Sequence, residues 1–267
     1  MPDKKVIWLL AREYEGWAEA GGVKDVVHDM SKGFIEIGWE VHVVLPFYGF
    51  LQDRIVAHGK KTWSGRSHHP LFSASVLESW EIVNGKLYFH FMKTPSFLVK
   101  KGIYTVTKDE EQPEVKLFHG MGYPDAPQMN LEFQWSIVEF WHQQQISPSF
   151  VLAHDGHCGF VSALARCDNH WKTFFKNTRF FLLIHNAGES YRQVMENNAK
   201  NAELIQLPQY VLKSLVWEQT WDPVIFSTVF GRVATVSENY AQEIESGATF
   251  RWQANPLARP LRKSGTE

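Results

Sequence analysis

Short, uninterrupted apolar runs recur along the chain, and each is followed by polar residues. Runs of this length without alternation are typical of strands that are covered on both faces, as in a parallel sheet. The pattern therefore predicts five strands, at residues 6–11, 41–46, 150–153, 180–184 and 232–236.

Between these runs, apolar residues recur every three or four positions, which is the period of a helix with one buried face. This predicts helices over residues 22–37, 130–145 and 158–168. Ser237 directly follows the last apolar run and is a good helix N-cap. Alternating strands and helices indicate βαβ units, so we expect an α/β fold with a Rossmann-like, mostly parallel sheet flanked by helices.

Residues 47–127 have a different pattern. Asn84-Gly85 stands between two alternating segments and predicts a hairpin with a type I′ turn, because both central residues of that turn need positive φ. We expect 47–127 to be an antiparallel insertion within a single domain of residues 1–254. The stretch 255–267 contains two prolines and no apolar periodicity, which predicts a linker or disordered tail.

Charge and cysteine content exclude several classes of partner. The 27 basic and 29 acidic residues nearly cancel to a net charge of −2, so we expect no nucleic-acid partner. No apolar run reaches the ~18 residues of a membrane span, and the run at 6–11 is too short for a secretion signal. Cys158 and Cys167 lie too far apart along one predicted helix to bridge, which favours a reducing, cytoplasmic location.

Candidate chemistry lies where the predicted strands end, because ligands of open parallel sheets collect at the carboxyl ends of the strands. The first strand leads through Arg12-Glu13 to Gly21-Gly22. The third ends in 154–157 (HDGH), and the fourth ends in 185–186 (HN). If these strands are parallel neighbours, their polar ends converge on one cleft.

Each of these segments also has a simpler interpretation. Gly21-Gly22 opens a helix whose N–H groups suit a diphosphate, but the pair also fits a tight turn, and no G-x-G-x-x-G is present. Asp25 in the first helical turn is equally explained by the helix dipole.

The segment 154–157 offers either metal ligands or hydrogen bonds to a polyhydroxylated ligand, and Asp155 alternatively caps the helix that starts near 157. No other cluster supplies further metal ligands at a recognisable spacing, so we expect no metal. His185-Asn186 is harder to explain by packing, because a flexible Ala187-Gly188 follows it.

Taken in order, these segments resemble the N-terminal domain of bacterial glycogen synthases and starch synthases, which are retaining glucosyltransferases of the GT-B fold. The resemblance covers residues 4–246. It rests on six short matches: 19–26 for K-x-G-G-L-x-D-V, 38–48 (GWEVHVVLPFY), GIY at 102–104 followed by Tyr123, HDGH at 154–157 for H-D-W-H, IHN at 184–186 for T-H-N with IQLP at 205–208, and TVSENYAQEI at 235–244.

The resemblance implies one lobe of a GT-B fold that uses neither a cofactor nor a metal. Its substrates would be a nucleotide sugar, ADP-glucose or UDP-glucose, and an α-1,4-glucan. The Gly21-Gly22 loop would approach the donor diphosphate, and the main-chain carbonyl of His185 would stabilise positive charge at the anomeric carbon. The implied catalytic residues are His185, Asn186 and Asp25, and the implied glucan-binding residues are Asp155, His154 and Tyr123.

Three departures from the family pattern qualify this implication. Glu19 replaces the lysine of K-x-G-G, Gly156 replaces the tryptophan of H-D-W-H, and the family's second Rossmann-like domain, in cis or in trans, would have to complete the site. We therefore expect the acceptor-side half of a glucosyltransferase that is inactive or very slow by itself. The alternative is a non-catalytic glucan-binding or regulatory module, and a metal-dependent hydrolase or a nicotinamide oxidoreductase is less favoured.

Overall fold

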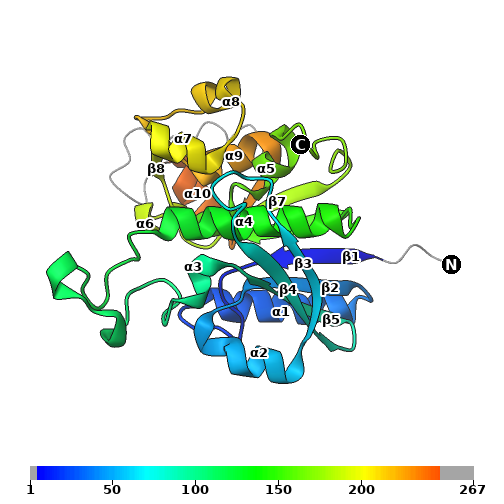
Figure 1. Cartoon of the computed structure of the whole chain (residues 1–267). Coiled ribbons are helices and arrows are strands. Elements are labelled where there is room, and N and C mark those ends of the chain that lie inside the picture. The colour runs from blue at the N-terminus through cyan, green and yellow to red at the C-terminus, as the bar shows by residue number, and fades with distance from the viewer. Residues whose placement is uncertain (1–4, 247–267) are drawn as a thin grey trace. The chain divides into compact units, whose positions relative to one another are not determined.

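The computed structural model describes residues 5–246, apart from the side chains of residues 189, 190, 245 and 246 (Figure 1). The chain divides into two compact units, Met1–Gln144 and Gln145–Glu267. The expected tail at 255–267 lies outside the described residues.

The first unit contains a five-stranded mixed sheet in the order β1-β2-β5-β4-β3. Strands β1 (Val6–Leu10), β2 (Glu40–Pro46) and β5 (Leu87–Lys93) are parallel. Strands β4 (Val76–Asn84) and β3 (Lys60–Arg66) extend it in antiparallel fashion. The two predicted strands of this unit are confirmed, and the segment 47–127 supplies both the antiparallel strands and β5, which continues the parallel part.

The hairpin between β4 and β5 is confirmed, but its turn type is not the predicted one. Asn84 pairs with Leu87, so the two central residues are Gly85 and Lys86 rather than Asn84 and Gly85. Gly85 has a φ of 62°, and it alone of the two has positive φ. Positive φ at the first central residue only is the pattern of a type II′ turn, which needs glycine at that position.

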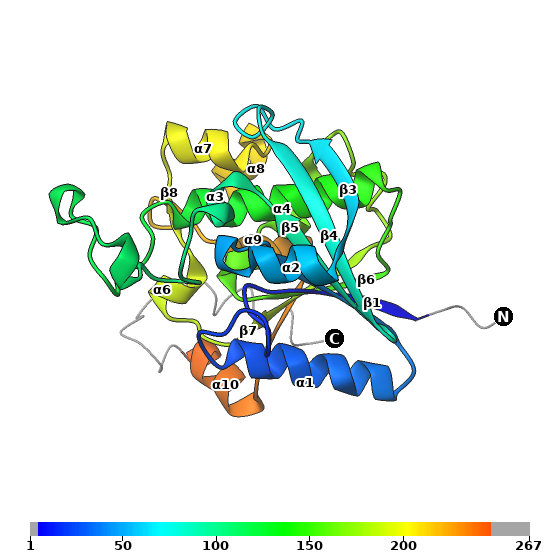
Figure 2. The same ribbon diagram turned by 60° about the horizontal axis from the view of Figure 1, so that its bottom comes forward.

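Helices cover both faces of this sheet (Figure 2). Helix α1 (Val23–Glu36) lies on one side, and α4 (Ala126–Gln143) lies on the other with α2 (Gln52–His58) and α3 (Pro95–Leu98). Helix α4 is buried all round, because every residue from 129 to 141 is shielded from solvent. Its buried acids are hydrogen bonded: Glu132 accepts from the main-chain N–H of Ser96 at 3.0 Å, and Glu139 from the Ser67 hydroxyl at 3.0 Å.

A long segment at 99–125 projects from the first unit (Figure 1). It contains the short 3₁₀ turns η2 (Lys108–Glu110) and η3 (Pro113–Val115), and η1 (Gly49–Leu51) precedes α2. The base of the segment is closed by a bridge between Thr105 and Gly122.

The second unit contains three parallel strands in the order β10-β7-β6, with bounds Arg232–Thr235, Arg179–Ile184 and Phe150–His154. These confirm the remaining three predicted strands. Helices α5 (Val161–Cys167) and α9 (Pro223–Phe230) pack on each other, and α9 packs on β7 and β10. The predicted helix at 158–168 begins later, at Val161, because the 3₁₀ turn η4 (Gly156–Cys158) precedes it.

The rest of the second unit consists of short elements. These are α6 (Glu189–Arg192), α7 (Ala199–Ile205), α8 (Gln209–Ser214), α10 (Glu238–Ser246) and the antiparallel pair β8 (Met195–Glu196) and β9 (Thr220–Trp221). The predicted cap is present, since the main-chain N–H of Tyr240 donates to the Ser237 hydroxyl at 3.1 Å. Cys158 and Cys167 are both buried, and no disulfide joins them. None of the helices in the described part of the chain has the length and apolar character that crossing a membrane requires.

Two glycine-to-alanine changes test the hairpin assignment with opposite expected signs. Gly85→Ala forces a side chain into the left-handed region and is expected to lower the free energy of unfolding by about 1–2 kcal/mol. Gly33→Ala lies inside α1, where a Cβ meets nothing within 4 Å, and is expected to raise it by about 0.5–1 kcal/mol. Urea unfolding of the two variants measures both changes, and equal effects of the same sign would contradict the assignment.

Candidate functional site

The loop between β1 and α1 presents an open helix N-terminus. Gly22 is the N-cap residue of α1, and no side chain caps the helix there. A Cβ at Gly22 would meet nothing within 4 Å, and Gly21 and Gly22 are both exposed. The first N–H groups of a 14-residue helix and its positive dipole end are therefore open to an anion.

The buried carboxylate of Glu13 fixes the conformation of this loop through hydrogen bonds. Its Oε2 accepts from the main-chain N–H groups of Ala20 at 2.9 Å and Gly21 at 2.7 Å, and its Oε1 accepts from the Tyr104 hydroxyl at 2.9 Å. A Cβ on Gly21 would lie 3.3 Å from Glu13 Oε1, a tight contact that glycine avoids. The presence of glycine at position 21 is thus explained by local packing, without a ligand.

Arg12, next to Glu13, is a buried cation that binds neutral oxygens. Its guanidinium donates to the Tyr48 hydroxyl at 2.9 Å, to Asn130 Oδ1 at 2.6 Å and to the main-chain carbonyl of Ile103. The same group lies 5.3 Å from the ring centroid of Tyr104. Burial, followed by the nearby Glu13 charge, raises the pKa of Tyr104 well above its ordinary value, so this tyrosine stays protonated.

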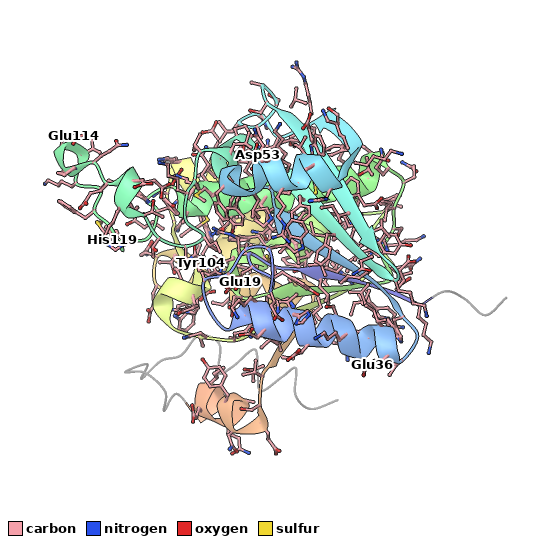
Figure 3. The ribbon with its side chains drawn as sticks, turned by 90° about the horizontal axis from the view of Figure 1, so that it is seen from below. Glu19, Glu36, Asp53, Tyr104, Glu114 and His119 are labelled. Carbon is pink, nitrogen blue, oxygen red and sulfur yellow. The ribbon has the colours of Figure 1, made fainter. Side chains whose placement is uncertain are left out.

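Two of the sequence-predicted residues, Glu19 and Asp25, are exposed beside this loop. Glu19 Oε1 accepts from the main-chain N–H of Gly16 at 2.5 Å, so its carboxylate turns back onto its own loop. Asp25 Oδ1 lies 2.5 Å from the Lys24 ammonium, and this hydrogen bond raises the pKa of Lys24. Figure 3 shows Glu19 at the start of α1 and Glu36 at its other end.

Tyr123 is buried at the base of the projecting segment. Its hydroxyl donates to Glu110 Oε2 at 2.7 Å and accepts from the main-chain N–H of Gly102 at 2.9 Å. Burial and the hydrogen bond to Glu110 raise its pKa above the ordinary value. The hydroxyl therefore braces the segment that carries Tyr104, and a direct contact of Tyr123 with sugar stays a prediction.

In the second unit, Asp155 joins the ends of β6 and β7. Its carboxylate oxygen Oδ1 accepts from the main-chain N–H groups of His185 at 2.8 Å and Asn186 at 3.3 Å. Asp155 is 3% exposed and has a φ of 56°, which is unusual for a residue with a side chain. Asp155 stands at the N-cap position of η4, as the alternative interpretation expects, but its side chain makes no capping hydrogen bond there.

Gly156 is required by close backbone packing. A Cβ at this position would lie 2.1 Å from the main-chain oxygen of Arg192, which leaves no room for any side chain. The tryptophan of the family pattern is therefore incompatible with the path of residue 192 in this chain.

His154 and His185 form a stacked pair of neutral imidazoles. His154 Nδ1 lies 2.8 Å from His185 Nε2, and the ring centroids are 5.1 Å apart. Burial lowers the pKa of His185 to about 4 and that of His154 well below its ordinary value. At neutral pH one ring donates its N–H to the other, and neither carries a charge. His154, at 2% exposure, supports His185 from within the core.

The turn after His185 is held by two further contacts. Asn186 Oδ1 accepts from the main-chain N–H of Gly188 at 2.8 Å, and the Tyr240 hydroxyl accepts from that of Ala187 at 2.6 Å. Tyr240 was not among the predicted site residues, although it belongs to the matched segment 235–244. Tyr104 was likewise not among them, whereas Arg12 and Glu13 were noted as polar residues at the end of the first predicted strand without an assigned role.

The structure thus gathers the predicted residues into two groups, one in each unit. The first unit holds Gly21, Gly22, Glu19, Asp25 and Tyr123, and the second brings His154, Asp155, His185 and Asn186 into direct contact. Within residues 5–246, no set of three or more histidine, cysteine or acidic side chains is arranged to hold a metal ion.

The chain is similar in sequence to known proteins. The family described as starch synthase catalytic domain matches residues 6–257. The glycogen synthase of Streptococcus sanguinis (strain SK36) is 24% identical over 250 residues, which cover 90% of this chain and 47% of that protein. Glycogen synthase 1 of Synechocystis sp. (strain ATCC 27184 / PCC 6803 / Kazusa) is 24% identical over 246 residues, 91% of this chain and 43% of that protein. The chain spans about half the length of the curated relatives it matches.

Among solved structures, the catalytic domain of starch synthase IV from Arabidopsis thaliana, bound to ADP and acarbose, has a TM-score of 0.69 at 18% identity. The likeness covers 98% of this chain and 50% of that one. It confirms the expected fold class, a mostly parallel sheet flanked by helices with an antiparallel hairpin, as in one lobe of the GT-B fold. Because the family match extends over residues 6–257, the chain belongs to the starch synthase catalytic domain family.

Proposed function

We propose that this chain is the acceptor-side half of a retaining glucosyltransferase that moves glucose from ADP-glucose or UDP-glucose to an α-1,4-glucan. The observation that carries the proposal is the Asp155 carboxylate, which accepts two main-chain hydrogen bonds from His185 and Asn186. This clamp fixes the orientation of the His185 peptide at the end of β7. Fixed dipoles of this kind stabilise charge that develops in a transition state without having to reorganise.

The neutral state of His185 suits this role. In retaining transfer, the bond between the anomeric carbon and the diphosphate oxygen breaks as the bond to the acceptor hydroxyl oxygen forms, and the acceptor proton passes to the departing diphosphate. Positive charge develops on the sugar, so a protonated imidazole beside it would oppose the reaction. With its pKa lowered to about 4, His185 is uncharged at neutral pH. In this proposal its main-chain carbonyl is the group that lies against the sugar.

The donor diphosphate is assigned to the open N-terminus of α1. The N–H groups there are uncapped, and Lys24 is the nearest cation in the first helical turn. Glu19, which stands where the family has lysine, is turned toward Gly16 and still adds negative charge to the loop. The solved starch synthase IV domain was bound to ADP and acarbose, which supports a nucleotide and an oligosaccharide as the ligand classes. A second Rossmann-like domain, in cis or in trans, completes the donor site in this proposal.

A non-catalytic glucan-binding module is the second candidate. It is favoured by Gly156, whose Cβ position is filled by the main chain of Arg192, and by the exposed Glu19. Both candidates bind glucan, and only the first transfers glucose once a second domain is supplied.

Glucan binding is expected to depend on Asp155. Asp155→Ala removes the clamp on His185 and Asn186 and is expected to weaken maltohexaose binding at least tenfold by calorimetry. Asp168→Ala is the control in the same unit, because Asp168 accepts from His170 within its own surface turn and should leave binding unchanged. Asp155→Asn keeps the size and shape of the side chain, and it is measured as well in case the alanine variant does not fold. Absence of saturable heat from the unaltered chain at millimolar maltohexaose would contradict glucan binding.

Transfer is expected to be very slow in the lone 267-residue chain, well below the ~1–10³ per second of ordinary enzymes. Fused to the C-terminal half of the Streptococcus sanguinis glycogen synthase, the chain should transfer glucose to glycogen. Glu19→Lys should raise that rate at least tenfold, because it replaces a repulsive charge by an attractive one.

Glu36→Lys is the matched control for this transfer assay. It makes the same charge change at the other end of α1, about 20 Å away. Equal acceleration by Glu36→Lys would reject the diphosphate assignment. Glucan binding by the fusion without any transfer would select the second candidate.

Stability is expected to fall as the pH drops from 6.5 toward 4. In that range the unfolded chain protonates the imidazole of residue 185 and the folded chain does not, so acid favours unfolding. Between pH 7 and pH 5 the contribution of His185 is about 2 kcal/mol. Urea unfolding should show a smaller loss in His185→Asn, while His58→Asn, at an exposed position on α2, should behave like the unaltered chain. An identical loss in both variants would mean that His185 is already charged in the folded state.

A further inference from the structure

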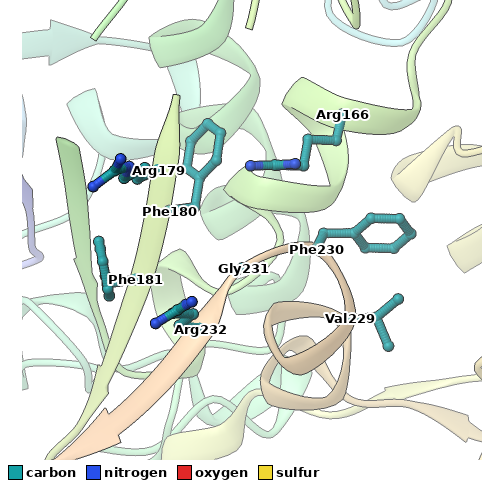
Figure 4. A pocket seen from close by; sticks show the side chains of 8 residues that line it. All are labelled: Arg166, Arg179, Phe180, Phe181, Val229, Phe230, Gly231 and Arg232. Carbon is teal, nitrogen blue, oxygen red and sulfur yellow. The ribbon is translucent and has the colours of Figure 1, made fainter. Parts of the chain in front are cut away.

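Strand β10 and helix α10 of the second unit lie beside the turn that follows β7. Strand β10 runs parallel to β7, with Arg232 opposite Phe181 near their amino ends (Figure 4) and Thr235 opposite Ile184 at their carboxyl ends. Helix α10 begins three residues after Thr235. Because parallel strands end at the same edge of a sheet, the residues that follow β10 fall next to those that follow β7.

Two side chains of this segment hold main-chain groups of the turn. The Thr235 hydroxyl donates to the main-chain carbonyl of Ile184 at 2.8 Å, directly before His185. The Tyr240 hydroxyl accepts from the main-chain N–H of Ala187 at 2.6 Å, two residues after His185. The peptide between residues 185 and 186 therefore lies between two fixed points.

Together with the contacts of Asp155 and Asn186, these bonds fix five consecutive residues. Asp155, at the end of β6, binds the N–H groups of residues 185 and 186, and the Asn186 side chain binds that of residue 188. Each residue from 184 to 188 thus has one main-chain group held by a side chain. A turn outside regular secondary structure has no ladder to satisfy its main chain, so these side chains decide its conformation.

The spacing of Thr235, Ser237 and Tyr240 follows from the way in which α10 starts. The Ser237 hydroxyl accepts from the main-chain N–H of Tyr240 at 3.1 Å, and the Ser237 carbonyl accepts from that of Ala241 at 3.0 Å. These bonds fix the first turn of α10, which carries Tyr240. Ile244, at 2% exposure, anchors the same helix. The helix is therefore a firm support for the tyrosine ring.

The Tyr240 hydroxyl is a neutral acceptor. Burial raises its pKa, and the charges of Asp155 and Glu243 raise it further, against the lowering effect of the Ala187 N–H. Ala187 is 2% exposed, so its N–H would be left buried without an acceptor if the hydroxyl were removed. Phenylalanine at position 240 would keep the ring and remove only this bond.

We propose that Tyr240 and Thr235 are positioning residues of the glucosyl-transfer site, which hold the peptides of residues 184–187 and thereby orient the main-chain carbonyl of His185. The inference rests on the function proposed above, because that function gives the orientation of this carbonyl a role. Dipoles that are fixed before the reaction need no reorganisation when charge develops. Tyr240 and Thr235 act through the main chain of His185 and not on the substrate itself.

The first test is amide exchange in the full 267-residue chain. Tyr240→Phe should speed exchange of the Ala187 N–H about tenfold, because its acceptor is lost, and should leave that of Ala241 in α10 unchanged. Tyr210→Phe, at a 74% exposed position on α8, is the control and should change neither. Unchanged exchange at Ala187 would overturn the proposal. Equal acceleration at Ala187 and Ala241 would also overturn it, since Tyr240 would then only dock the helix.

The second test is glucose transfer by the fusion described above. Tyr240→Phe and Thr235→Val should each lower kcat about tenfold and leave KM for glucan unchanged, because the oriented carbonyl acts in the transition state. Thr228→Val is the matched control. It removes an equivalent bond, from the Thr228 hydroxyl to the main-chain carbonyl of Ile225 at 2.8 Å in α9, and should leave kcat unchanged.

The transfer assay separates failure of this inference from failure of the proposed function. Transfer that is as fast in Tyr240→Phe as in the unaltered fusion would overturn the positioning role alone. A loss of kcat in Thr228→Val as large as that in Thr235→Val would overturn the role of Thr235. No transfer by the unaltered fusion would overturn the proposed function and the positioning role with it.

Discussion

A buried carboxylate that accepts two main-chain N–H groups is the interaction on which both candidate half-sites depend. In the first unit Glu13 binds the N–H groups of Ala20 and Gly21, and in the second Asp155 binds those of His185 and Asn186. An ionised carboxylate in the interior is costly unless its oxygens are hydrogen bonded, and such charge-assisted bonds contribute about 1.5–3 kcal/mol each. The same bonds fix the peptide planes of the loops, so the geometry of each loop follows from one acid at the end of one strand.

The sequence predicts the elements much better than it predicts these contacts. Apolar runs identify all five predicted strands, and a turn glycine identifies the β4–β5 hairpin, because both signals are local. The turn type was missed since the strand pairing places Asn84 opposite Leu87, and register depends on the whole sheet. Judged from its neighbours in the sequence, Asp155 resembles a helix cap. The main-chain N–H groups that its side chain binds lie 30 and 31 residues further along the chain.

Glu19 and Gly156 show why residue types alone mislead at a site. A glutamate in place of a lysine suggests direct repulsion of a phosphate, but the direction of its side chain is decided by the N–H of Gly16. A glycine in place of a tryptophan suggests a lost ligand contact, but the main chain of Arg192 fills the space that any side chain would need. In both cases a main-chain atom of another residue determines what the position can hold. The path of the main chain there is not specified by any single residue.

Charge in the second unit is separated along β7. At the carboxyl end, burial keeps His154 and His185 neutral, which an imidazole allows because its ordinary pKa is close to neutral pH. At the amino end, Arg179 and Arg232 cannot be neutralised in this way and are accordingly exposed. Six residues of strand span about 17 Å, so neither end screens the other through direct contact. Strand β7 therefore has neutral imidazoles at its buried carboxyl end and an exposed guanidinium group at its amino end.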